Sequence, residues 1–334
     1  MTLSLNAAVF VYHDGPEIAF EALCQQSLGR PDFLISGERW LFLRPPFDLM
    51  PEGNRMPRCF CCGPTSFDRR GLLKTAFWAT ALSAAGLPAL GQAPPASAGP
   101  ANAALLEDLV AANRILYDQG VVDGFGHVSV RHDKDSARYL LSRSMAPALV
   151  TADDILEYDL DSNPTDPKGR TSYLERFIHG EIYKARPDIV AVVHSHSPAV
   201  IPFADTTVPL RPMNHIGGFL GSGAPVFEIR DAAGPASDML IRNPSLGHAL
   251  ALSLGTHSVA LMRGHGSVAV AQSIRHVVFR AVYTEVNARM QSEAMKLGTP
   301  TFLNPEEAAA AAKTNDGLVD RPWALWKQRA MGKT

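Results

Sequence analysis

Between residues 103 and 300 the hydrophobic and polar positions follow two spacings, which predict helices and short strands in turn. Apolar residues three and four apart predict an opening helix that ends near Gly120, with Leu105, Leu106, Leu109, Val110 and Leu116 on its apolar side. Short segments at 127–132, 138–142 and 155–160 are expected to be strands. The pattern predicts a mixed α/β chain.

Three more helices are predicted by the same spacing and by residues that favour helix ends. The segment 173–185 ends before Pro187 and has an apolar stripe of Leu174, Phe177, Ile178, Ile182 and Ala185. Asn243 and Pro244 suit the start of a helix, and Gly255 suits its end. A long helix is expected over 273–297, with an apolar face of Ile274, Val277, Val278, Ala281, Val282 and Val286.

The most informative polar residues are histidines that follow two apolar runs. His194 and His196 end the run 189–193, and alternate residues of a strand point the same way, so both imidazoles leave one face. His265 follows the run 258–262 and lies between glycines, which allow backbone and ligand to approach closely. Three neutral imidazoles at strand ends suit a divalent metal with an open position for substrate. For a single His-x-His pair, ordinary surface or core histidines are the alternative.

Glu175 lies beside the apolar stripe of the predicted 173–185 helix, at its N-terminal end and directed toward the sheet. A carboxylate there can ligate a metal or, when substrate displaces it, transfer a proton. The alternative is a glutamate that interacts only with the helix dipole. Glu175 is therefore a candidate catalytic residue.

The order of these motifs resembles the class II aldolase/adducin family: Glu175 first, then 194–196, then the Arg-Gly-His-Gly segment 263–266. The resemblance implies a single three-layer α/β/α domain, about residues 99–303, around a mainly antiparallel sheet. It also implies proton transfer by Glu175 and one divalent metal per subunit, expected to be zinc or manganese, held by His194, His196 and His265. Members are typically homotetramers with active sites at subunit interfaces, so this resemblance implies a homo-oligomer.

Two loops depart from the sugar-phosphate aldolases of that family. His127 stands in the Gly-rich loop 124–131 where those enzymes have asparagine, and Tyr173-Leu174 replaces a Ser-Ser pair. The second loop, 142–147, contributes Arg143 and Ser144 instead of phosphate-binding residues. Because a guanidinium binds carboxylates bidentately, these changes favour a planar aromatic carboxylate over a phosphorylated ketose.

These loops resemble the decarboxylase branch of the family, and in particular the hydroxymethylpyridine-dicarboxylate decarboxylase-like members. We expect substrate contacts from Arg143, Ser144, His127 and His215. For His215 a hydrogen-bonded core histidine is an equal alternative.

Three functions are consistent with these motifs. The first is a metal-dependent, non-oxidative decarboxylase of a hydroxylated aromatic or heteroaromatic (di)carboxylic acid. The second is a metal-dependent aldolase of an unphosphorylated substrate, and the third is a non-catalytic adducin-like interaction module. The presence of three histidines and Glu175 argues against the third, because an interaction module needs no metal site.

The first 98 residues are interpreted as a targeting segment rather than as part of the enzyme domain. Arg69 and Arg70 precede the apolar stretch 75–90, and this resembles a twin-arginine export signal over 56–98, with translation starting at Met56 and 1–55 a doubtful extension. A periplasmic location is expected, with a flexible linker and a cytoplasmic location as the alternative. The apolar stretch is too short for a stable membrane span. Ala96-Ser97-Ala98 is the expected cleavage motif, with Ala89-Leu90-Gly91 as the alternative.

Charge and the C-terminal segment add two further expectations. A net charge of −2 gives no basic footprint, so nucleic acid is not expected as a partner. Residues 304–334 form a tail whose alanine-rich part, 306–312, is expected to be helical. Trp323 and Trp326 in this tail are expected to pack onto the body or a neighbouring subunit.

Overall fold

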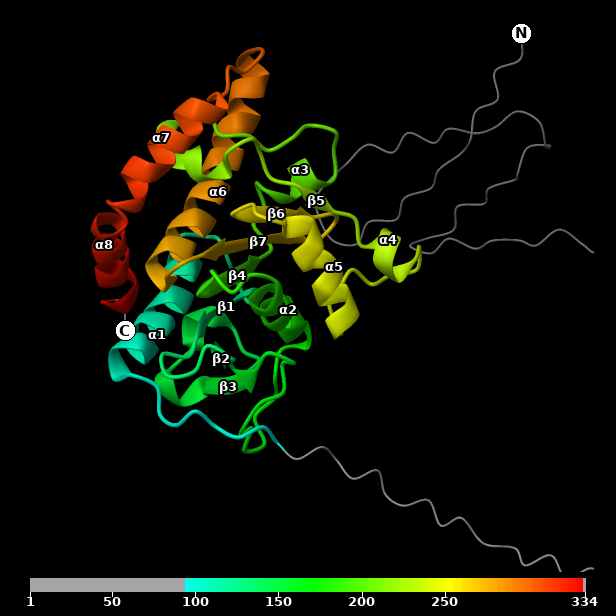
Figure 1. Ribbon diagram of the computed structural model, residues 1–334. Helices are drawn as coiled ribbons and strands as arrows, with labels where there is room; N and C mark the ends of the chain where they lie inside the picture. Colours follow the sequence, from blue (N-terminus) through cyan, green and yellow to red (C-terminus); the bar gives the residue numbers. More distant parts are fainter. Residues whose placement is uncertain (1–93, 333–334) are drawn as a thin grey trace, which may run out of the picture. The chain divides into compact units, whose positions relative to one another are not determined.

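A single seven-stranded sheet lies at the centre of the computed structural model, which describes residues 94–332 (Figure 1). The strands lie in the order β3-β2-β1-β4-β7-β6-β5, and all neighbours are antiparallel except β5 and β6. Their bounds are β1 (His127–Arg131), β2 (Arg138–Ser142), β3 (Ile155–Asp159), β4 (Ala191–Ser195), β5 (Val226–Phe227), β6 (Val259–Met262) and β7 (Gly266–Ala271). The predicted mainly antiparallel sheet is confirmed.

Helices cover both faces of this sheet. The α-helices are α1 (Ala103–Asp118), α2 (Phe177–Ala185), α3 (Ile201–Ala204), α4 (Arg230–Ala233), α5 (Pro244–Leu254), α6 (Ile274–Leu297), α7 (Pro305–Asp316) and α8 (Asp320–Met331). Short 3₁₀ turns are η1 (Pro147–Leu149), η2 (Ala152–Asp154), η3 (Leu174–Arg176) and η4 (His215–Leu220). Buried side chains of α1, α6 and α8 pack on one face, and those of α2 and α5 pack on the other. The result is the expected three-layer α/β/α domain.

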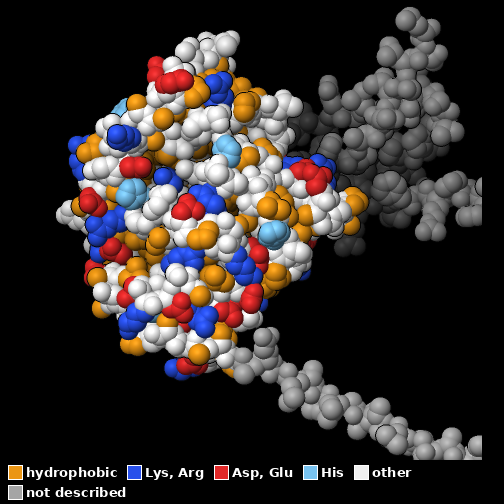
Figure 2. All heavy atoms as spheres, viewed as in Figure 1, with side chains coloured by type: hydrophobic (Ala, Val, Ile, Leu, Met, Phe, Trp, Pro, Cys, Tyr) orange, Lys and Arg blue, Asp and Glu red, His pale blue; other side chains and the backbone are white. Residues whose placement is uncertain are grey.

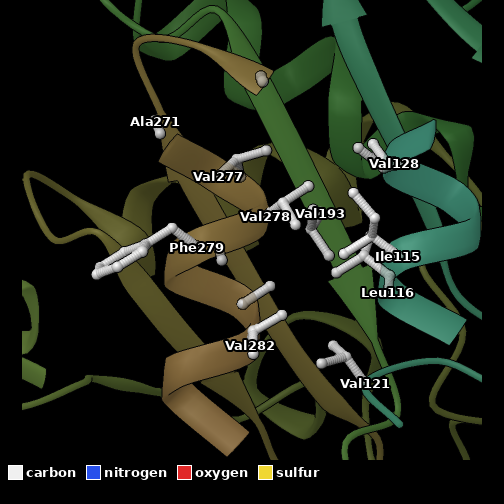
Figure 3. Packing of buried hydrophobic residues seen from close by; sticks show 14 of the residues in the cluster. Ile115, Leu116, Val121, Val128, Val193, Ala271, Val277, Val278, Phe279 and Val282 are labelled. Carbon is white, nitrogen blue, oxygen red and sulfur yellow. The ribbon is translucent and has the colours of Figure 1, made fainter. Parts of the chain in front are cut away.

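Alternate residues of strand β4 contribute to the hydrophobic cores on the two faces of the sheet. Ala191 and Val193 join the core under α1 and α6, where Val193 lies between side chains of both helices (Figure 3). Val192 points the other way, into the core under α2 and α5. Because side chains alternate along a strand, His194 follows Val192 onto the α2 side. The alternation therefore decides which layer receives the histidines.

Helix ends follow the residues that the sequence offers for them. The side chain of Asn243 accepts a hydrogen bond from the backbone N–H of Leu246, and Gly255 ends α5 with a φ of +52°. Ser273 caps α6 in the same way through His276. These predicted boundaries are confirmed.

The predicted apolar face of α6 is wrong at one position. Val286 is 37% exposed, and the buried face continues instead through Asn287 and Gln291. Both amides hydrogen-bond the backbone of the segment 209–213, with Asn287 Nδ2 donating to the carbonyl of Arg211. Polar side chains are buried here because they pair with backbone groups of Pro209, Arg211 and Met213, which lie in no helix or strand.

The C-terminal tail packs onto the body of the domain. Trp323 and Trp326 are buried in the same core as α1 and α6, and the Trp326 ring lies 5.8 Å from that of Tyr283. Of the two surfaces expected for these tryptophans, the structure shows the domain's own. The predicted helix in the alanine-rich part is confirmed as α7.

Removing the Trp326 indole should destabilise the fold. We expect Trp326→Ala to lower the free energy of unfolding by about 3–5 kcal/mol, because it leaves a large cavity beside Tyr283. Urea denaturation followed by circular dichroism measures this. Leu325→Ala is the control, since that side chain is 56% exposed and should change stability by no more than about 0.5 kcal/mol. Equal effects of the two changes would contradict a buried role for Trp326.

Residues 94–98 are the described part of the predicted export segment. The backbone N–H of Ala98 donates to Glu157 Oε1 at 2.8 Å, and the Ser97 hydroxyl donates to the same carboxylate. The apolar stretch, the twin arginines and residues 1–55 lie outside the described residues, so export stays a prediction. Within 94–332, no helix has the length and hydrophobicity needed to cross a membrane.

Charges of both signs are interspersed on the face of the domain shown in Figure 2. Lysines and arginines alternate there with aspartates and glutamates, so that face carries no single-sign field.

Candidate metal centre

Four predicted side chains meet beside the ends of the strands β4 and β6. His194 ends β4, His196 follows the strand, and His265 lies in the turn between β6 and β7. His196 Nε2 lies 3.2 Å from His194 Nε2 and 3.0 Å from His265 Nε2. Glu175 Oε2 lies 3.4 Å from the Nε2 atoms of both His194 and His265. All four ligand atoms lie within 4.8 Å of one another, as a shared metal requires.

Backbone carbonyls fix two of these imidazoles in the form that binds metal. His194 Nδ1 faces the carbonyl of Ser267 at 3.2 Å, and His265 Nδ1 faces that of Met239 at 2.9 Å. Since a carbonyl can only accept, each of these imidazoles in its neutral form carries its hydrogen on Nδ1 and presents a lone pair at Nε2. These lone pairs converge on His196 Nε2 beside a carboxylate, an arrangement that a divalent cation satisfies.

Burial favours the unprotonated form of His196. Together with the adjacent His194 and His265, which act in the same direction, it lowers the pKa of His196 to about 4. Burial alone would raise the pKa of Glu175, but His194 and His265 outweigh it and hold that pKa far below its usual range. At neutral pH the site offers an electron-pair donor at His196 and a negative carboxylate.

Glu175 is held by a backbone conformation that differs from the predicted continuous helix. Residues 174–176 form the 3₁₀ turn η3, and Glu175 has φ −92° and ψ 16°, outside the α-helical region. Its Oε1 accepts a hydrogen bond from the backbone N–H of Ile241 at 3.0 Å. This bond leaves Oε2 directed at the histidines.

Two glycines bring the backbone close enough to form the site. A Cβ on Gly266 would lie 2.0 Å from the carbonyl oxygen of Ser195, so any side chain there would displace β4. Gly126 has a φ of +92°, and a Cβ on it would lie 3.0 Å from the carbonyl oxygen of His194. The expected close approach at Gly266 is confirmed.

A pocket of about 400 Å³ opens onto this centre. Its lining residues are largely aromatic or apolar: Gly124, Phe125, Gly126, His127, Ser144, Met145, Ala146, Tyr173, Leu174, Glu175, His196 and Leu240. Phe125 stacks on His196 with ring centroids 6.0 Å apart, and it is 68% exposed at the rim. The volume and aromatic walls suit a small planar ligand.

The predicted substrate residues divide into two groups. His127 and Ser144 line the pocket beside the metal centre. Arg143 does not line it; its Nε donates to Asp154 Oδ1 at 2.7 Å. His215 is exposed at the start of η4, which packs against α7, so it is neither in the pocket nor a core histidine. The buried residues after it, Gly217 to Leu220, face the core instead, and a substrate contact by His215 stays a prediction.

Sequence reasoning missed a buried polar layer between β1 and α2. His179 is fully buried, and its Nε2 lies 2.6 Å from His127 Nδ1. Its Nδ1 lies 2.6 Å from Ser129 Oγ, which in turn lies 2.8 Å from the hydroxyl of Tyr183. The signal was present: Glu175, His179 and Tyr183 are spaced by four residues and share one face of the predicted 173–185 helix, and Ser129 shares a strand face with His127.

Comparison with known proteins gives one family and several decarboxylases. The model of the "Class II Aldolase and Adducin N-terminal domain" family matches residues 107–292, more than half of the chain. The chain is 39% identical over 235 residues to "Decarboxylase tropJ" of Talaromyces stipitatus, covering 64% of this chain and 88% of that protein. It is 31% identical over 209 residues to a "3,4-dihydroxyphthalate decarboxylase" of Arthrobacter keyseri, covering 58% of this chain and 79% of that protein.

Solved structures share the fold at lower identity. An aldolase II superfamily protein from Pseudomonas syringae superimposes with a TM-score of 0.59 at 21% identity, covering 70% of this chain and 95% of that one. An L-fuculose 1-phosphate aldolase from Glaciozyma antarctica gives 0.58 at 21% identity with the same coverage. These likenesses concern the fold alone.

Proposed function

The chain belongs to the class II aldolase and adducin family, and from this premise we propose that it is a divalent-metal-dependent, non-oxidative decarboxylase of a hydroxylated aromatic carboxylic acid. It is a carbon–carbon lyase, since its relatives are named decarboxylases and aldolases. The observation that carries the finer proposal is the convergence of three imidazole Nε2 atoms and Glu175 at the base of an aromatic-walled pocket.

The chemistry needs a place for the electron pair of the broken bond. A bound divalent metal would supply Lewis-acid stabilisation of the negative charge that develops on a substrate oxygen. His194, His196 and His265 would hold that ion, and Zn or Mn is the proposed metal. Their Nε2 atoms are already directed at a common point, so little reorganisation is needed on binding.

Glu175 is the proposed group for proton transfer. In the free site its carboxylate is ionised and can take the proton of the ring hydroxyl as the substrate binds. When the carboxyl group leaves as carbon dioxide, both bonding electrons stay on the ring carbon. Glu175, directly or through a water, returns the proton to that carbon. The product oxygen is then a phenolate and takes one proton from water on release, since loss of carbon dioxide from a carboxylate consumes one proton overall.

Product analysis is the direct test of this function. Metal-loaded protein should release one carbon dioxide per substrate consumed from ortho-hydroxylated aromatic acids, with 3,4-dihydroxyphthalate as the first candidate because relatives are named for it. Formation of an aldehyde from unphosphorylated hydroxy-keto compounds, without carbon dioxide, would establish the aldolase alternative. If the protein shows neither activity and binds no metal, the non-catalytic adducin-like module is the remaining alternative.

Arg143 is the proposed clamp for a substrate carboxylate. Its Nε is used by Asp154, whereas its Nη groups bond to no other residue within 94–332, and its neighbour Ser144 lines the pocket. We expect Arg143→Ala to raise KM by roughly 10- to 100-fold with a smaller change in kcat, because charge-assisted hydrogen bonds are lost. Steady-state kinetics measure this. Arg186→Ala, which breaks an Arg–Asp pair outside the pocket, is the matched control. An unchanged KM for Arg143→Ala would limit Arg143 to its pairing with Asp154.

Assembly and location stay part of the proposal. A homotetramer is proposed from the family resemblance, and periplasmic export from the twin-arginine motif at Arg69 and Arg70. Sedimentation of the purified protein measures the first, and cell fractionation measures the second.

A further inference from the structure

A continuous chain of hydrogen bonds runs from the pocket into the interior between β1 and α2. It begins at His127, passes through His179 and Ser129, and reaches the hydroxyl of Tyr183 over distances of 2.6, 2.6 and 2.8 Å. The Tyr183 hydroxyl also lies 3.3 Å from the carbonyl oxygen of Val190. All four side chains in the chain are buried, so water does not compete for these bonds.

The Val190 end of this hydrogen-bond chain determines which atom donates in each of its bonds. The Val190 carbonyl can only accept, so the contact there requires Tyr183 to donate its single hydroxyl hydrogen to it. Tyr183 must then accept from Ser129, and Ser129 must accept from His179 Nδ1. In the opposite direction the Tyr183 hydrogen would go to Ser129, and the Val190 contact would be lost. Only one direction satisfies all four contacts.

The same order of donors and acceptors extends through the two histidines to the pocket. Burial lowers the pKa of His179 to about 3, so this imidazole is neutral and carries one hydrogen. With the hydrogen on Nδ1, its Nε2 is an acceptor, and His127 must donate to it from Nδ1. His127 Nε2 is then left with a lone pair and bonds to no residue within 94–332.

His127 is positioned to use that lone pair on a ligand. It lines the pocket, its ring centroid lies 4.5 Å from that of Tyr173, and it lies 5.1 Å from that of His194. It is therefore next to the metal centre without being part of the four-residue cluster. A ligand held at that centre would bring the neighbouring atoms of its ring toward His127.

We propose that His127 is a specificity-determining residue that accepts a hydrogen bond from a second ring hydroxyl, adjacent to the one at the metal centre, and that the chain ending at Tyr183 fixes His127 in this accepting form. This deepens the proposed function, on which it rests for the nature of the ligand. It assigns the pocket to aromatic acids with two adjacent hydroxyls. Tyr183, Ser129 and His179 are positioning residues, because they act only through His127.

The accepting form of His127 can be tested without any enzymatic activity. Long-range ¹H–¹⁵N correlation spectra of full-length, zinc-loaded protein labelled in histidine should show hydrogen on Nδ1 of both His127 and His179. Tyr183→Phe removes the link to Val190, so Ser129 can turn and donate to His179, and hydrogen should appear on His127 Nε2. Hydrogen on His127 Nε2 in the unmodified protein would overturn the proposal.

Tyr139→Phe is the matched control for this experiment. The Tyr139 ring lies 6.2 Å from that of His179, but its hydroxyl lies 3.0 Å from Ser162 Oγ and 3.2 Å from the carbonyl oxygen of Arg176, both outside the hydrogen-bond chain. Tyr139→Phe also removes one tyrosine hydroxyl, and it should leave the hydrogens of His127 and His179 on Nδ1. A shift equal to that of Tyr183→Phe would mean that the spectra report general repacking, and it would overturn the directional chain.

Substrate discrimination tests the hydroxyl contact itself. The ratio of kcat/KM for a dihydroxy aromatic acid to kcat/KM for its analogue methylated at the second hydroxyl should fall by roughly 10-fold in Tyr183→Phe, the loss expected for one hydrogen bond. It should be unchanged in Tyr139→Phe. An unchanged ratio in Tyr183→Phe, despite a shifted hydrogen on His127, would refute the contact. Absence of carbon dioxide release from every substrate would refute the proposed function, while the spectra still decide the form of His127.

Discussion

His194→Ala should abolish metal retention and lower kcat/KM by roughly 10³-fold or more. The expected loss follows from the several kcal/mol by which a Lewis-acid ion stabilises developing charge, since each 1.36 kcal/mol is a factor of ten in rate. His194 is fully buried, and its Nε2 lies 3.2 Å from His196 Nε2 and 3.4 Å from Glu175 Oε2, so the change removes one of four ligand atoms that lie together. Metal content by inductively coupled plasma spectrometry and carbon dioxide release measure the two effects.

Controls separate metal loss from unfolding. His248→Ala removes a histidine with a 59% exposed side chain on α5 and should leave metal content and activity unchanged. His265→Ala removes a second ligand from a different loop and should reproduce the loss. Circular dichroism checks that each variant is folded. Full activity of a folded, metal-free His194→Ala protein would exclude metal-dependent catalysis.

Much of the centre could be predicted because its residues lie in regular elements. The position of His194 follows from the alternation of β4, and His265 from the short turn between two antiparallel neighbours. Both are local consequences of strand geometry. Glu175 could be placed near them because its helix must cover the same face of the sheet.

What could not be predicted depends on contacts between distant segments. Arg143 has the residue type of a carboxylate clamp, but Asp154 takes its Nε, and only the fold brings those two together. His179 was missed although its spacing places it on the face of Glu175 and Tyr183, because that spacing does not identify its partners, which lie on β1 about 50 residues earlier. The location of His215 could not be predicted either: it is exposed at the start of η4, which packs against α7, and it does not line the pocket.

Glu175→Gln should lower kcat by roughly 10²- to 10⁴-fold while metal content and KM change little. General acid–base groups contribute about that much to rate. Glutamine has the same shape, and its amide oxygen can still accept from the backbone N–H of Ile241, so the side chain should keep its place. It cannot take or return a proton. Glu181→Gln is the matched control, because Glu181 is also buried, on α2, but pairs with Lys184 outside the pocket.

The outcome distinguishes the two roles that a carboxylate can have at this position. If Glu175 transfers the proton, Glu175→Gln keeps the metal and binds substrate, and the slow step becomes protonation of the ring carbon. Turnover in deuterium oxide should then show a larger solvent isotope effect on kcat than the unmodified protein. If Glu175 serves only as a ligand, the same variant should lose metal, and added metal should restore most of the rate. Restored activity would contradict proton transfer, because the three histidines alone would then be sufficient for the reaction.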